Sequence, residues 1–118
     1  MVNSNSKGKR GELEFAHALT DMGIQARRGQ QFSGSPDSPD VVTDLKGVHF
    51  EVKRCESLSL YKALAQAEDE CGDSLPVVAH RRNNKPWLVC VKLDDLLAFC
   101  RLVVEQGGKD EREMDRQG

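Results

Sequence analysis

The sequence predicts an α/β domain in which a mixed central β-sheet is flanked by helices, in the order α-β-β-β-α-β-β-α. Apolar residues recur at helical spacing in long segments, and short apolar or alternating segments are separated by turn-forming residues. A chain of 118 residues with 38% hydrophobic residues is also suited to one compact core. Together the element order and the length predict a single mixed α/β layer structure.

The first helix is expected over residues 9–22, and Gly23 follows as a residue that ends it. Residues 24–28 form a short strand candidate, and residues 29–38 are rich in loop-forming residues. The apolar stripe of the helix has i, i+3, i+4, i+7 spacing and consists of Phe15, Ala18, Leu19 and Met22.

A hairpin is predicted from residues 40–45 and 48–53, joined at Lys46-Gly47, although a bulge remains an alternative. Side chains alternate along a strand, so this register divides the residues between two faces. The core-facing residues would be Val41, Thr43, Leu45, Val48, Phe50 and Val52. The other face would carry Asp40, Val42, Asp44, His49, Glu51 and Lys53.

A second helix is expected over residues 58–71, with Leu60, Leu64, Ala67 and Cys71 along one stripe and Gly72-Asp73 as its end. Two apolar strands follow at 75–80 and 87–92, and Asp94 is placed to cap a last helix that runs to about Glu105. The apolar residues of that helix are candidates for core or interface: Leu96, Leu97, Phe99, Leu102, Val103 and Val104.

We expect one domain over residues 1–106 and a disordered charged tail over 107–118, where the only apolar residue is Met114. No apolar run approaches the roughly 18–20 residues that span a bilayer. Residues 1–10 lack the apolar segment of a signal peptide, and we therefore expect a cytoplasmic protein. The four cysteines include no Cys-x-x-Cys pair, so we expect buried free thiols rather than disulfides or zinc.

The net charge of −2, from 17 Lys and Arg against 19 Asp and Glu, taken alone argues against a nucleic-acid partner. The basic residues are clustered, however, and clustered Arg and Lys side chains are the usual contacts to phosphate. For the group at 81–85, solubilising loop charge is an equal alternative. The candidate DNA-binding residues are Lys7, Lys9, Arg10, Arg27, Arg28, Arg81, Arg82 and Lys85.

The polar face of the hairpin predicts a catalytic metal site. In the predicted register Asp40 lies opposite Lys53 and diagonal to Glu51, so two carboxylates can converge on one divalent cation. A cation there would lower the pKa of an attacking water, and a lysine would orient that water or stabilise developing charge. This combination suits phosphodiester hydrolysis, whereas a merely solvated strand face is the alternative.

Glu12 shares a helix stripe with Phe15, Ala16 and Leu19, where a carboxylate is costly unless it meets a cation or a hydrogen-bond donor. It is therefore a candidate for the same metal site, and an exposed position at the edge of the stripe is the alternative. Asp37 competes with Asp40 because Ser-Pro-Asp occurs twice, and Asp40 is favoured because a strand follows it directly. We expect His49 to be solvated or hydrogen-bonded at the far end of this face.

These residues resemble the PD-(D/E)xK nucleases, and among them the archaeal-type Holliday junction resolvases. Pro39-Asp40 and Glu51-Val52-Lys53 look like the core motif. Lys7-Gly8, Glu12 and Gly23 resemble the first helix of that family, Ser33-Gly34-Ser35 its serine loop, and Gln66-Ala67-Glu68 its second helix. The resemblance covers about residues 7–72 well and 75–93 only by strand pattern.

The resemblance implies a restriction-endonuclease-like core and a Mg²⁺-dependent homodimeric endonuclease, of phage or bacterial origin, that cuts branched DNA by paired nicks. Mn²⁺ is expected to substitute for Mg²⁺. By position, the metal would be held by Asp40, Glu51, Glu12 and the backbone carbonyl of Val52. Lys53 would assist the water, Ser33 would contact the scissile region and Gln66 would support the site.

Two alternatives remain open from the sequence. The first is a restriction-like or nicking endonuclease that acts on linear duplex DNA with the same chemistry. The second is a catalytically inactive DNA-binding module that keeps the fold, against which the intact Asp40, Glu51 and Lys53 argue.

Overall fold

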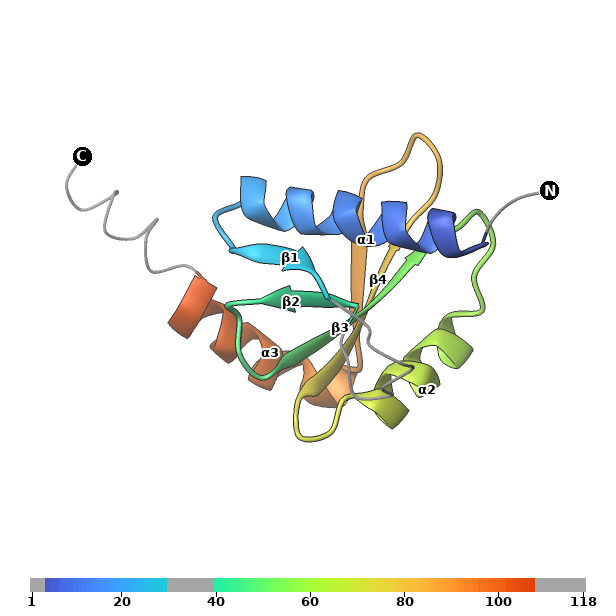
Figure 1. Ribbon diagram of the computed structural model, residues 1–118. Helices are drawn as coiled ribbons and strands as arrows, with labels where there is room; N and C mark the ends of the chain where they lie inside the picture. Colours follow the sequence, from blue (N-terminus) through green and yellow to red (C-terminus); the bar gives the residue numbers. More distant parts are fainter. Residues whose placement is uncertain (1–3, 30–39, 108–118) are drawn as a thin grey trace.

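The computed structural model describes residues 4–29 and 40–107, and Figure 1 shows their arrangement. The predicted roles of Ser33 and Asp37, the loop around them and the tail beyond Gly107 lie outside the described residues. The elements are α1 (Ser4–Asp21), β1 (Ala26–Arg28), β2 (Val41–Thr43), β3 (Val48–Arg54), α2 (Leu60–Glu70), β4 (Leu75–Arg81), β5 (Leu88–Val91), η1 (Leu93–Asp95), α3 (Leu96–Leu102) and η2 (Val103–Gly107).

A mixed three-stranded sheet in the order β3-β4-β5 lies at the centre of the fold. β3 and β4 are parallel and β4 and β5 are antiparallel. Parallel neighbours need a long crossover connection, and α2 supplies it. Helices α1 and α2 cover opposite faces of this sheet (Figure 1). The predicted class, a mixed β-sheet flanked by helices, and the predicted element order are therefore confirmed.

The predicted hairpin between β2 and β3 is wrong. β2 pairs with β1 in an antiparallel register, Ala26 with Thr43, Arg27 with Val42 and Arg28 with Val41. The chain leaves β2 because the Thr43 hydroxyl accepts the N–H of Leu45 at 3.1 Å, a local bond that competes with strand pairing. The turn at Lys46-Gly47 is present, with Gly47 at φ +89°.

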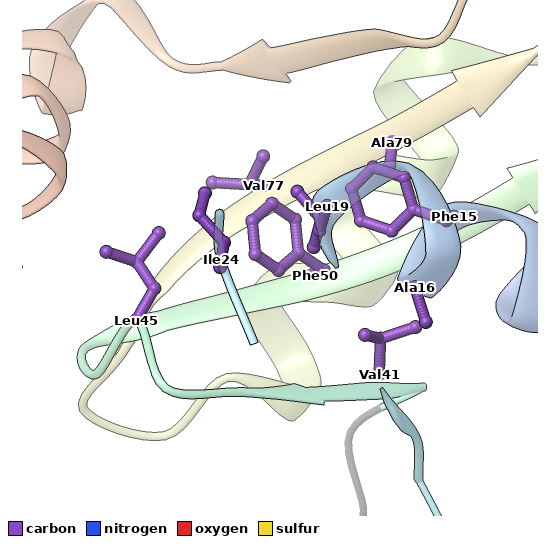
Figure 2. Close-up of a cluster of buried hydrophobic side chains, with 9 residues drawn as sticks. All are labelled: Phe15, Ala16, Leu19, Ile24, Val41, Leu45, Phe50, Val77 and Ala79. Atoms are coloured by element: carbon purple, nitrogen blue, oxygen red, sulfur yellow. The ribbon is translucent and has the colours of Figure 1, made fainter. Parts of the chain in front are cut away.

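The core lies between α1 and the sheet, as Figure 2 shows. The ring of Phe15 on α1 packs edge-on against the ring of Phe50 on β3, with 5.2 Å between the ring centroids. The ring of Trp87 is tilted against Phe15, with 4.9 Å between the centroids. The predicted stripe of α1 is correct for Phe15 and Leu19 and wrong for Met22, which is 65% exposed. The helix ends at Asp21 and Gly23 adopts φ +98°, so Met22 falls outside the last turn.

Helix α1 approaches β3 closely at Gly11. A Cβ atom built there would lie 2.6 Å from the Cβ of Arg54, which is closer than carbon atoms can pack. In the next turn of α1, Glu14 accepts hydrogen bonds from Arg54 at 3.0 Å and from Arg81 at 2.6 Å. This charged bridge joins α1 to the ends of β3 and β4.

The chain is helical from Leu93 to Gly107, two residues longer than the predicted last helix at its C-terminal end. Asp94 does not cap it; Asp95 occupies the N-cap of α3 and makes no side-chain cap bond. Phe99 and Val103 pack against the core, whereas Leu97 is 77% exposed. The Gln106 amide both accepts the N–H and donates to the carbonyl of Lys46, each at 2.9 Å.

Helix α2 begins at Leu60 and buries Ala63 and Ala67, so Leu60 of the predicted stripe is exposed instead. The four cysteines are free thiols as predicted, but none is fully buried and Cys100 is exposed. Among the described residues, no helix is long and apolar enough to cross a membrane.

Candidate active site

Asp40 reaches the middle of β3 with its side chain. Its Oδ2 accepts the backbone N–H of Val52 at 2.9 Å, while its own carbonyl accepts the N–H of Gly29 at 2.9 Å. The second bond holds the backbone of Asp40 beside the end of β1. The predicted proximity of Asp40 to Glu51 is therefore present, although a side-chain bond produces it and strand pairing does not.

Glu51 and Lys53 project from β3 on the face that α2 covers. Glu51 is 2% exposed, and its Oε2 lies 3.4 Å from the Nζ of Lys53. That ammonium group donates a hydrogen bond at 3.0 Å to Oε1 of Gln66 on α2. Glu51 on this face of β3 is buried because the crossover helix α2 lies over it. The alternative of a merely solvated strand face is therefore wrong at Glu51. Gln66 thus fixes the position of the lysine.

The negative charge at this site is only partly compensated. Burial, together with the neighbouring carboxylates of Glu51, Glu12 and Glu70, raises the pKa of Asp40 to about 7 against the opposing effect of the Val52 N–H. A buried carboxylate with this pKa is poised to exchange its proton for a metal cation. Carboxylate oxygens from Asp40 and Glu51 are hard donors of the kind that Mg²⁺ prefers, so the donor set fits a divalent cation.

Glu12 is half-buried and its charge acts on Asp40, but it already has a partner. Its Oε1 accepts a hydrogen bond from Nε of Arg28 at 2.9 Å. Burial raises the pKa of Glu12, and Arg28 opposes that rise. A carboxylate on the core-facing stripe of α1 was expected to need a cation or a hydrogen-bond donor, and Arg28 supplies both. Metal contacts by Glu12 and by the Val52 carbonyl remain predictions.

The predicted DNA-binding residues divide into two groups. Arg28 and Arg81 form ion pairs with Glu12 and Glu14 and are partly exposed, and their contacts to DNA remain predictions. The side chain of Lys7 lies outside the described residues. The exposed members that remain are Lys9, Arg10, Arg27, Arg82 and Lys85.

Two more residues lie beside the candidate site: Glu70, which sequence reasoning missed, and His49, which it placed at the far end of the same strand face. Of the two expectations for His49, solvated or hydrogen-bonded, the first is wrong, because His49 is 6% exposed and lies under α2. Its Nε2 lies 3.8 Å from Glu51 Oε1 and 3.9 Å from Glu70 Oε1. Spacing contained the signal: His49 is two residues from Glu51 on one strand, and Glu70 is one helical turn after Gln66.

The carboxylates of Glu51 and Glu70 affect each other's pKa, and His49 lies beside both. Burial by itself raises the pKa of Glu51, but the facing His49, Glu70 and Lys53 groups outweigh it and leave its pKa lowered. The pKa of Glu70 is raised by burial and by the carboxylate of Glu51. In the absence of a cation, Glu70 is therefore the member of the pair that holds a proton more readily.

No family model matches the chain, and neither does any curated protein. Among solved structures, the chain is similar to the 1.6 Å structure of Archaeoglobus fulgidus Hjc, a Holliday junction resolvase from an archaeal hyperthermophile. The sequence identity is 24%, the match covers 72% of each chain, and the TM-score is 0.49. Similarity at this level does not define a substrate, so the function of this chain must follow from its own residues.

Proposed function

We propose that this protein is a metal-dependent endonuclease that hydrolyses phosphodiester bonds in DNA. The observation that supports it is that Asp40 is hydrogen-bonded to Val52, between Glu51 and Lys53 on β3, and feels the charge of Glu51, while Gln66 holds Lys53 in place. Two carboxylates and one positioned ammonium group are the components that metal-assisted phosphodiester hydrolysis needs. A strand face that served only solubility would not bury Glu51 to 2% exposure.

In the proposed mechanism Asp40, Glu51 and the carbonyl of Val52 hold Mg²⁺, with Mn²⁺ as a substitute. When bound, the cation supplies Lewis acidity and offsets charge on the phosphate. Lys53 donates a hydrogen bond to the attacking water or to a phosphate oxygen, and it is aimed by its bond to Gln66. Burial of Glu51 under α2 keeps competing water away from its oxygens.

The proposed substrate is branched DNA, with four-way junctions cut by paired nicks. This choice rests on the likeness of the motifs around Glu12, Asp40, Glu51 and Gln66 to those of junction-resolving nucleases. The DNA backbone would meet the exposed Lys9 and Arg10 on α1, Arg27 on β1, and Arg82 and Lys85 between β4 and β5. Two symmetric cuts need two active sites, so we propose a homodimer.

The test is cleavage of a synthetic four-way junction by wild-type protein and by Asp40→Asn, with Mg²⁺ present. Asp40→Asn is expected to lose cutting by about 100-fold or more, because a charged ligand is removed, and to keep binding the junction. Asp44→Asn is the matched control, since Asp44 is exposed and lies only four residues away. It is expected to cut like wild type.

Three results would each contradict part of the proposal. Cutting by Asp40→Asn at the wild-type rate would reject the site assignment. A wild-type protein that binds DNA but shows no Mg²⁺ binding by calorimetry would indicate the inactive DNA-binding module. Equal cutting of the junction and of a linear duplex of the same sequence would keep the chemistry and reject the branched substrate.

A further inference from the structure

A cluster of three potential metal ligands lies between β3 and α2, beyond the Asp40 side of the site. It consists of His49 and Glu51, which share one face of β3, and Glu70, the last residue of α2. One ligand atom from each lies within 4.8 Å of the others. His49 and Glu51 are almost completely buried, whereas the side chain of Glu70 is 28% exposed and lies on the solvent side.

Two buried polar atoms of this cluster have no hydrogen-bond partner among the described residues. They are Nε2 of His49 and Oε1 of Glu51, which face each other at 3.8 Å, beyond hydrogen-bond distance. A buried polar atom without a partner costs about 1–3 kcal/mol. Both atoms point into the same space, so a single ligand placed there would satisfy them together.

We propose that His49, Glu51 and Glu70 form a binding site for a divalent transition-metal cation such as Zn²⁺, Co²⁺ or Mn²⁺. An imidazole nitrogen combined with carboxylate oxygens suits these cations, whereas Mg²⁺ takes oxygen ligands. This site is separate from the one proposed for Mg²⁺, which uses Asp40. It shares Glu51, whose Oε1 faces His49 while Oε2 faces Lys53.

Two of the three separations fit such a cation after a small contraction, and the third, between the carboxylate oxygens of Glu51 and Glu70, is within 4.8 Å. With metal–ligand bonds of about 2.0–2.1 Å, ligand atoms around a tetrahedral cation lie about 3.3 Å apart. The two distances from His49 Nε2 are 3.8 and 3.9 Å, so each atom must move by only a few tenths of an ångström. The partly exposed Glu70 is free to turn inward, and its exposure leaves one position for water.

The position of Glu70 at the end of α2 also favours a cation. The C-terminal end of a helix carries partial negative charge, which is unfavourable for a carboxylate. Glu70 adds its charge to that of the buried Glu51, and no Lys or Arg lies in the last turn of α2. A bound dication would offset all three contributions. In its absence, a proton shared between the carboxylates is the competing arrangement.

Co²⁺ is the probe that tests this site directly, since its visible absorption reports nitrogen and oxygen coordination without any DNA. Titration of the full chain in excess Mg²⁺, which occupies the Asp40 site, is expected to give one bound Co²⁺. His49→Gln and Glu70→Gln should each weaken binding by about tenfold or more. The exposed His17→Gln and Asp69→Asn are the matched controls and should bind Co²⁺ like wild type. Zn²⁺ should raise the Tm of wild type but not of Glu70→Gln, which loses only a partly exposed group and is expected to fold.

Several outcomes would overturn the inference. These are no Co²⁺ binding, equal binding by Glu70→Gln, or a near-ultraviolet thiolate band that disappears when the cysteines are blocked. Asp40→Asn separates this inference from the proposed function, because it should bind Co²⁺ while losing Mg²⁺-dependent cutting. Normal cutting by Asp40→Asn with intact Co²⁺ binding rejects only the nuclease site. Loss of cutting by Asp40→Asn together with loss of Co²⁺ binding rejects only the separate cation site.

Discussion

Asp40 carries a carboxylate into a region where three other carboxylates act on it, and this gives stability a specific pH dependence. Its pKa is about 7 in the folded protein against 3.8 for an unperturbed group. Between these values the folded state binds more protons than the unfolded state. The free energy of unfolding contributed by Asp40 therefore falls as the pH rises from about 4 to about 7 and stays low above that range.

We predict that Asp40→Asn stabilises the metal-free protein at pH 8 by about 1–2 kcal/mol, after allowance for solvent and relaxation. At pH 4, where the carboxyl is largely protonated, the variant and the wild type should differ little. Urea unfolding with a chelator present, at both pH values, measures this difference. The same difference at both pH values would show that Asp40 is not held at a raised pKa.

The residues of the proposed site differ in how far sequence could place them. Asp40, Glu51 and Lys53 were identified because the motif spacing fixes them, whatever element pairs with β2. His49 was misjudged because its burial depends on α2 packing over β3, which strand alternation does not reveal. The pairing of Arg28 with Glu12 on the neighbouring helix was not foreseen either. Long-range partners of this kind are not encoded in local patterns.

At the scale of elements, the approach of α1 to β3 depends on the missing side chain of Gly11. We predict that Gly11→Ala lowers the free energy of unfolding by about 1–3 kcal/mol, because its Cβ would meet that of Arg54 at 2.6 Å. Gly8→Ala, one turn earlier on α1, is the control. Nothing lies within 4 Å of its Cβ position, so it should be neutral or stabilise by about 0.5–1 kcal/mol.

Chemical denaturation of the two alanine variants at one pH compares them directly. If Gly11→Ala is as stable as Gly8→Ala, α1 does not pack against β3 as closely as described. A change of the m-value in either variant would point to altered cooperativity instead of local overpacking.

The elements themselves were predictable, but one strand pairing was not. Within the described residues, apolar periodicity and turn residues predicted the order of the three α-helices and five β-strands, since these signals are local. β2 could pair with β1 or with β3, and its alternation is compatible with both. The outcome depends on the Thr43 turn and on the docking of α1 above β1, which are tertiary effects.

At the scale of the whole molecule, the exposed apolar residues near the C-terminal part of the described chain favour self-association. Leu88 on β5 is 62% exposed, Leu93 on η1 is 82% exposed and Leu97 on α3 is 77% exposed. β5 is also an edge strand of its sheet, and edge strands are common places for contacts between chains. These residues are the candidate dimer surface for the proposed homodimer.

We predict that wild-type protein is a dimer at micromolar concentration and that the double variant Leu93→Glu with Leu97→Glu is a monomer. Burying two charges at an apolar contact opposes association. Met22→Glu, at an exposed apolar residue after α1, is the control and should remain dimeric. Light scattering gives the mass in each case. A monomeric wild type would reject the dimer, and a dimeric double variant would move it to another surface.

The bond between the Gly29 N–H and the Asp40 carbonyl has a consequence for how this protein can diversify. It brings the two ends of an intervening ten-residue segment to a common base, independently of what that segment contains. Closing a loop costs only about 0.6 kcal/mol more for each doubling of its length. A change in the number of residues between Gly29 and Asp40 is therefore expected to leave the pairing of β1 with β2 intact, so this part of the sequence is open to variation in length.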